Sequence, residues 1–216
     1  LPLNENSEIR TNDHPYANWI GTNDSSNVIY SNIFFPDSFS MITLFDKISL
    51  TEKEDSLIEA LQIIDKRILK ISLSGSAKIE KGEQRKGFKV KLEGYQEPMN
   101  LASLGDGIWH VLKLYLSILN IEDGYLFIDD IDTGLHYSIL QQLWKSIALL
   151  AEKNNVQIFS TTHSRDCFEA LAAIASREDR GEKKVSIQRI STEKDVAIWY
   201  SEREIIAVAN NGVEVR

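Results

Sequence analysis

Hydrophobic residues in the first part of the chain follow a helical spacing. Residues 1–27 are polar and rich in Asn, Asp and Ser, which predicts an irregular start, and residues 28–35 have the composition of a short strand. Residues 38–47 fit one short helix. A longer amphipathic helix is predicted after the capping-box spacing of Thr51 and Glu54, because apolar residues then recur at steps of three and four: Leu57, Ile58, Leu61, Ile64 and Ile68.

Alternation of apolar and polar residues replaces this helical period between residues 69 and 92. The apolar positions expected to share one face are Leu69, Ile71, Leu73, Phe88, Val90 and Leu92. A charged, glycine-containing stretch at residues 78–87 separates the two runs. They are therefore expected to form a β-hairpin or neighbouring antiparallel strands.

Strands and helices alternate after residue 101. Helices are expected at 108–119, 137–152, 165–177 and 202–209, and short strands at 125–128, 156–160, 185–190 and 196–200. This order predicts an α/β fold, in which a mainly parallel sheet is flanked by helices and preceded by a helical and antiparallel β segment. The corresponding division is an irregular start with a short strand and helix (1–50), a helix with a hairpin (51–100) and the α/β portion (101–216).

Composition narrows the class of protein. The chain has 216 residues, 43% of them hydrophobic, so it can bury a core and is not a disordered protein. Its 24 Lys and Arg against 32 Asp and Glu give a net charge of −8, which argues against gripping nucleic acid by bulk charge. A single cysteine, Cys167, excludes an internal disulfide, and no apolar run is long enough for a membrane span. A cytoplasmic protein that does not enter the membrane is expected.

The first candidate motif is Ser103-Leu104-Gly105-Asp106-Gly107, directly before a predicted helix. The two glycines allow close approach of a ligand to the backbone, and free N–H groups at a helix N-terminus suit a phosphate. The alternative is an ordinary glycine turn in which Ser103 or Asp106 is the N-cap.

The second motif places two adjacent carboxylates, Asp129 and Asp130, after the apolar residues 125–128. Those apolar residues predict a buried strand, and ligand-binding groups of α/β sheets lie at the carboxyl ends of strands. Neighbouring residues on a strand point to opposite faces, so the two aspartates are expected to have different tasks. One suits Mg²⁺ and the other suits a water molecule. The alternative is that these aspartates only end a strand and begin a turn.

The third motif, Thr161-Thr162-His163-Ser164, ends the next strand of the sequence. A single histidine at a strand end is usually structural. Its position after the strand that follows the acidic pair favours a functional role for His163, because neighbouring parallel strands end at the same edge of a sheet.

In this order the three motifs resemble the C-terminal half of an ABC-type ATPase domain of the RecF-, SMC- and OLD-like group, over about residues 50–216. The resemblance implies a P-loop NTPase fold, ATP and Mg²⁺ as cofactors, and a homodimer formed through ATP. It makes residues 126–130 similar to Walker B, with Asp129 on Mg²⁺ and Asp130 on the attacking water, and it makes His163 similar to the switch histidine that senses the γ-phosphate. The residues similar to the signature motif and the D-loop, which the resemblance implies contact nucleotide, are Ser103, Gly105, Asp106, Gly107, Asp132, Thr133 and Gly134.

Two positions depart from the family pattern. The family usually has Glu where this chain has Asp130, and the shorter side chain withdraws the carboxylate by about 1 Å, so slow hydrolysis is expected. The usual signature serine falls on Gly105, so backbone N–H groups are expected to carry more of that contact.

No G-x-x-x-x-G-K-[ST] phosphate cradle (Walker A) occurs in the chain. We therefore expect the chain to be the C-terminal portion of an ATPase, inactive alone, whose first partner is its own upstream Walker A segment. Two other functions stay open: a degenerate, non-catalytic interaction module, and an ATPase subunit of a DNA-repair or phage-defence nuclease system. Six basic residues could form a local DNA-binding strip or only a solvated β edge: Lys78, Lys81, Arg85, Lys86, Lys89 and Lys91.

Overall fold

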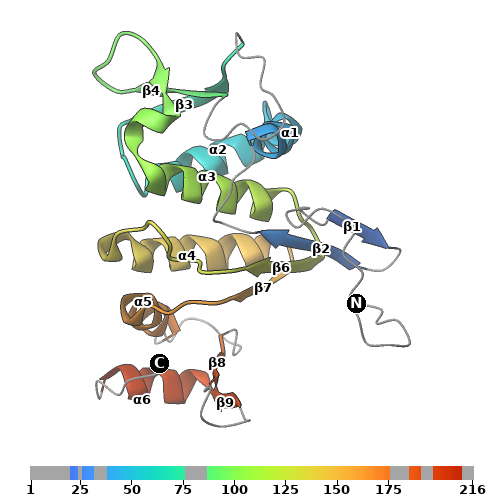
Figure 1. Cartoon of the computed structure of the whole chain (residues 1–216), viewed down its shortest axis with the longest axis vertical. Coiled ribbons are helices and arrows are strands. Elements are labelled where there is room, and N and C mark those ends of the chain that lie inside the picture. Colours follow the sequence, from blue (N-terminus) through green and yellow to red (C-terminus); the bar gives the residue numbers. More distant parts are fainter. Residues whose placement is uncertain are drawn as a thin grey trace.

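The computed structural model describes residues 20–23, 26–31, 38–75, 87–175, 185–190 and 197–210. Residues 1–19 of the predicted irregular start lie outside these ranges, as do residues 78–86 of the charged stretch, which include the predicted basic residues Lys78, Lys81, Arg85 and Lys86. The described chain forms three sheets and six α-helices, which Figure 1 shows arranged along the long axis of the molecule.

A four-stranded sheet lies at the centre of the α/β portion. Its strands are β1 (Ile20–Asn23), β2 (Ser26–Ser31), β6 (Gly124–Ile128) and β7 (Val156–Ser160), in the order β1-β2-β6-β7. β2, β6 and β7 are parallel, and only β1 is antiparallel to its neighbour. The predicted fold class, a mainly parallel sheet with helices, is therefore confirmed.

The predicted irregular start is wrong at residues 20–23 and 26–27, which belong to strands. β1 occupies part of that polar stretch, and β2 begins at Ser26, two residues before the predicted strand, whose last residues 32–35 lie outside the described ranges. β2 pairs along its length with β6, with Asn27 opposite Gly124 and Ser31 opposite Ile128. Ladder hydrogen bonds of the backbone override weak side-chain preferences for a strand, so a polar sequence can be recruited into a sheet by its neighbour.

Helix α3 (Asp106–Leu119) forms the middle of the core. Every residue from 108 to 119 is buried, because the helix packs against α1 (Ser38–Ile48), α2 (Glu52–Leu61) and α4 (Tyr137–Lys153). Figure 1 shows α3 between α1 and α2 on one side and α4 on the other. The helix is therefore buried around its whole circumference, and it begins within the predicted signature segment.

The predicted helix that starts after Thr51 is confirmed but ends at Leu61 rather than continuing to Ile68. The Thr51 hydroxyl caps it by accepting from the Lys53 N–H at 3.2 Å. The periodic apolar pattern continues past the end of the helix because Ile68 starts β3 and packs into the same core. Hydrophobic spacing alone does not separate a helix from the strand that follows it.

A second sheet contains β3 (Ile68–Leu73), β4 (Phe88–Leu92) and β5 (Met99–Asn100), all antiparallel, as the alternation predicted for the first two. Leu69 is exposed, contrary to prediction, because the register shifts between Ile68 and Lys70. β4 lies between β3 and β5, so Lys89 and Lys91 are not on a free sheet edge.

The last part of the chain packs beneath α4. α5 (Arg165–Ala175) contacts α4 on one side and α6 (Glu202–Asn210) on the other. β8 (Ile187–Ile190) and β9 (Ala197–Tyr200) form a separate two-stranded antiparallel sheet. These two predicted strands therefore do not extend the parallel sheet.

Candidate functional site

The acidic pair and the switch segment meet at the carboxyl ends of β6 and β7. The two strands are parallel and in register, with Ile128 opposite Ser160. Asp129 and Thr161, the next residue of each strand, therefore begin neighbouring loops. The sequence predicted this meeting of the second and third motifs at one edge of the sheet.

Thr161 joins the two loops through its hydroxyl group. Its Oγ1 lies 2.5 Å from Asp129 Oδ1 and 2.9 Å from the Asp130 backbone nitrogen. Because the Asp130 N–H can only donate, the hydroxyl accepts from it and donates its own proton to the Asp129 carboxylate. One oxygen of Asp129 is thereby engaged, and Oδ2 is the oxygen left for a cation.

Asp130 does not continue the strand. It has a φ of 48°, in the left-handed region, and β6 ends at Ile128. Asp129 and Asp130 were expected to point to opposite faces because they lie on a strand. That reason is wrong, because both residues follow the end of β6. Their environments differ for another reason: the chain turns sharply between them, and both side chains are half-buried.

A second threonine makes a similar contact. The Thr162 hydroxyl donates to Asp132 Oδ1, and Thr162 Oγ1 accepts from the Ser164 N–H at 3.0 Å. The predicted D-loop residues Asp132 and Thr133 are half-buried, and Gly134 is exposed with a φ of 73°. The ring of His163 is exposed beside this pair of loops, on the stretch that leads into α5.

The predicted signature segment, residues 103–107, spans the end of a short 3-10 helix, η1 (Leu101–Leu104), and the start of α3. Gly105 is the N-cap, with φ 91° and ψ −178°, a conformation that only glycine adopts readily, and no side chain caps the helix. Neither Ser103 nor Asp106 is therefore the N-cap of α3, so the caps named in the ordinary-turn alternative are wrong, while a glycine turn at this position is present. Ser103, Gly105 and Asp106 are exposed.

The signature segment and the D-loop are in contact. A Cβ atom on Gly107 would lie 3.2 Å from the Gly134 carbonyl oxygen and 3.6 Å from Leu135 Cδ2. A larger residue at position 107 would push the two segments apart. The segment that carries the first motif therefore lies against the loop that follows the acidic pair.

His110 forms a further connection that sequence reasoning missed. It is only 7% exposed, and its Nε2 lies 2.7 Å from the Ile131 carbonyl oxygen, to which it donates. Burial lowers the pKa of His110 to about 4, so the ring is neutral at pH 7. The available signal was a histidine within a mainly apolar helical stretch.

Comparison with known proteins now decides the family. The profile of the AAA ATPase domain matches residues 17–168, well over half of the chain. The chain belongs to the AAA ATPase domain family. The matched range includes β6, β7 and His163, and it confirms the ATPase family expected from the motifs.

Two relatives cover different lengths of this ATPase domain. An ATP/GTP phosphatase of Helicobacter pylori is 26% identical over 160 residues, which are 72% of this chain and 40% of that protein. An uncharacterised protein of Methanocaldococcus jannaschii is 33% identical over 75 residues, which are 35% of this chain and 66% of that protein. The ATPase domain therefore spans less than half the length of the Helicobacter relative.

One of two similar solved structures shows the same fold. An SMC ATPase, studied for ATP-driven dimerisation and DNA-stimulated activation, has a TM-score of 0.50 at 9% identity, covering 81% of this chain and 98% of that one. An SMC head bound to the C-terminal winged-helix domain of ScpA has a TM-score of 0.48 at 11% identity, covering 74% and 49%. The first likeness shows the P-loop NTPase fold of SMC heads.

Carboxylates of the ATPase domain do not build a metal site alone. Within the described residues, no group of three or more His, Cys, Asp or Glu side chains could hold an ion. Mg²⁺ in nucleotide sites is usually held by one or two carboxylates together with phosphates and water. The half-buried Asp129, with Oδ2 available, fits that mode of binding.

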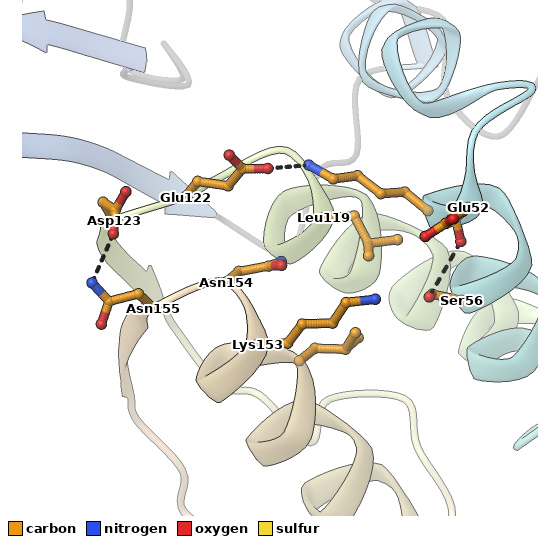
Figure 2. Close-up of a pocket in the computed structure, with 10 residues that line it drawn as sticks. Glu52, Ser56, Leu119, Glu122, Asp123, Lys153, Asn154 and Asn155 are labelled. Atoms are coloured by element: carbon orange, nitrogen blue, oxygen red, sulfur yellow. Dashed lines mark hydrogen bonds and ion pairs between the residues drawn. The ribbon is translucent and has the colours of Figure 1, made fainter.

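A pocket of about 360 Å³ lies at the opposite end of the sheet (Figure 2). Lys53 pairs with Glu122 there at 2.6 Å, and Asn155 donates to Asp123 at 2.7 Å. Lys153 points across the pocket towards α2 in Figure 2. No predicted site residue lines this pocket, because it lies where β6 and β7 begin.

None of the described helices is long and apolar enough to cross a membrane.

Proposed function

We propose that this ATPase domain is the C-terminal portion of an enzyme that binds and hydrolyses ATP, and that two copies enclose the nucleotide and change conformation with it. The observation that carries the proposal is the juxtaposition of Asp129 and Asp130 with Thr161 at the ends of β6 and β7. Carboxylates and a hydroxyl at adjacent parallel strand ends are the groups that nucleotide chemistry in α/β sheets requires.

Three residues would divide the chemistry of hydrolysis. Asp129 would hold Mg²⁺, which supplies charge neutralisation at the phosphates. Asp130 would orient the attacking water and accept its proton, and the exposed imidazole of His163 would contact the γ-phosphate. The carboxylate of Asp130 is one methylene shorter than a glutamate, so slow turnover is expected.

The signature residues would act on nucleotide held by the second copy. The N-terminus of α3 has no side-chain cap, so its first N–H groups can donate to phosphate oxygens. Ser103 and Asp106 lie exposed on either side of Gly105, and Gly107 lies against Gly134. Asp132 and Thr133 would contact the same partner copy, because the D-loop adjoins the signature segment.

The Walker A segment would come from an upstream part of the same protein. An exposed apolar face supports this proposal: Tyr125, Phe127 and Phe159 on β6 and β7 are 39%, 37% and 42% exposed. Phe127 and Phe159 are cross-strand partners whose rings stack at 4.9 Å. The strand at 125–128 is thus buried on only one face, contrary to expectation, and a helix from the upstream segment would cover the other.

DNA is a second possible partner, because DNA stimulates the SMC ATPase with the same fold. One residue of the predicted basic strip is engaged elsewhere: the Lys91 ammonium donates to the carbonyl oxygens of Tyr95 and Gln96. The chain would alternatively act as the ATPase subunit of a DNA-repair or phage-defence nuclease system.

The test is ATP turnover and nucleotide-dependent dimerisation of the full-length protein with Mg²⁺. Asp130→Asn is expected to abolish turnover while retaining ATP binding, and dimers are expected to accumulate with ATP in light scattering. Asp46→Asn, the same change on an exposed position of α1, is the control and should behave like wild type. Wild-type protein that neither binds ATP nor dimerises with it would contradict the proposal. Unchanged cellular activity of Asp130→Asn would favour the non-catalytic interaction module.

A further inference from the structure

Thr161 occupies an unusual position between the two loops of the candidate site. Its backbone N–H donates to the Ile128 carbonyl oxygen at 3.0 Å, and its own carbonyl oxygen accepts from the Ile131 N–H at 3.1 Å. These two bonds bracket the acidic pair on both sides. The backbone of Thr161 therefore fixes where the Asp129–Asp130 turn begins and ends.

The side chain of Thr161 adds a second pair of bonds inside this bracket. The hydroxyl donates to Asp129 Oδ1 and accepts from the Asp130 N–H. Only a hydroxyl can perform both tasks through one atom, so serine could replace threonine but valine could not. The donated proton fixes which carboxylate oxygen of Asp129 faces away from Thr161.

The contact with Asp130 also has a conformational role. A left-handed φ is unfavourable for residues other than glycine, and it persists only where the surroundings hold it. The hydroxyl of Thr161 accepts the N–H of this strained residue. Without the hydroxyl, the Asp129 carboxylate would be free to rotate. The backbone turn at Asp130 would also lose a hydrogen bond that holds it.

We propose that Thr161 is a positioning residue for the reaction proposed above, holding Asp129 towards the cation and Asp130 towards the water. The inference rests on that proposed function. Groups that orient a metal ligand typically affect metal affinity by about 10- to 100-fold. Thr161 acts on the ligand and on the adjacent catalytic candidate together, so its loss should affect both Mg²⁺ affinity and turnover.

The experiment compares Thr161→Val with Thr161→Ser in the full-length protein. Thr161 is exposed, so neither change removes core packing. Thr43→Val is the matched control, because Thr43 donates from an exposed position of α1 to the Phe39 carbonyl oxygen, far along the chain from the site. The readouts are the Mg²⁺ concentration for half-maximal binding of a fluorescent ATP analogue, kcat, and the melting temperature.

Thr161→Val is expected to raise the half-maximal Mg²⁺ concentration about tenfold and to lower kcat about tenfold or more. Its nucleotide binding without Mg²⁺ should stay within about twofold of wild type. Thr161→Ser should restore both quantities, and Thr43→Val should change neither. Equal defects in the Ser and Val variants, or a Val variant with wild-type Mg²⁺ dependence, would overturn the inference alone. Wild-type protein that binds no nucleotide would overturn the proposed function and this inference with it.

Discussion

The Nε2 atom of His110 lies 2.7 Å from the carbonyl oxygen of Ile131, which ties the helix after the signature segment to the loop after the acidic pair. Both ends of this bond are buried, and the ring is held in its neutral form. The His110 ring is therefore neutral at neutral pH. Protonation in acid would place a charge on this buried ring, so the free energy of unfolding should depend on pH.

The free energy of unfolding is expected to fall as the pH is lowered from 6.5 towards 4. The unfolded chain binds a proton at His110 near pH 6.5, whereas the folded chain does so only near pH 4, so protons favour the unfolded state between these values. The contribution is about 3 kcal/mol in total. Urea unfolding at several pH values measures it.

His110→Gln supplies the control for this pH dependence. The glutamine amide can donate to Ile131 but does not titrate. The variant should lose the part of the pH dependence between 6.5 and 4 that comes from the imidazole. An identical slope in wild type and variant would assign the acid sensitivity to other groups.

Gly105→Ala is expected to destabilise the protein by about 1–3 kcal/mol, because its φ of 91° and ψ of −178° are strained for any residue with a Cβ atom. Gly75→Ala is the control: its added Cβ would meet nothing within 4 Å and its φ is not in the left-handed region. That change should stay within about 0.5 kcal/mol. Chemical unfolding compares them, and equal effects would contradict the geometry described for α3.

The Cys167 thiol is expected to react slowly in the folded protein. It is 1% exposed, and burial raises its pKa to about 11. A thiol reagent at pH 8 should label it about a hundredfold more slowly in native protein than in denaturant, because both access and the thiolate fraction are reduced. Rapid labelling of the native protein would show that α5 separates from α4.

Phe159→Ala tests whether the exposed face of β6 and β7 is covered in the full-length protein. Truncation of a covered phenylalanine to alanine lowers the free energy of unfolding of the protein by about 3–5 kcal/mol. Truncation of an exposed phenylalanine lowers it far less. Phe39→Ala on α1 is the matched control, since Phe39 is 55% exposed. Similar small losses at both positions would argue against an upstream segment on this face.

The sequence was sufficient to predict the helices and strands whose pattern of apolar residues is set by burial. Residues 106–119 and 137–153 are helices because their apolar residues face a core, and the strands at 124–128 and 156–160 follow from short apolar runs. The order of the motifs was sufficient to bring the second and third motifs to the same edge of the sheet, since parallel neighbours end there, but it did not predict the contact between Thr161 and Asp129.

Other features depend on partners that are distant in the sequence. β1 and β2 are strands because β2 pairs with β6, and Leu69 is exposed because the pairing with β4 slips by one residue. Aspartate is a common turn residue and tolerates the left-handed region, but the position of the turn at Asp130 depends on the contacts of the neighbouring loop. Local composition does not encode these tertiary contacts.

The burial of α3 on all sides has a mechanical consequence. Rotation of this helix about its own axis would require its neighbours α1, α2 and α4 to repack, so it can transmit displacement only as part of a rigid block. The signature segment at its N-terminus is then not a flexible finger that reaches for a ligand. If two copies enclose a nucleotide as proposed above, this segment would approach it only together with the packed helices around α3.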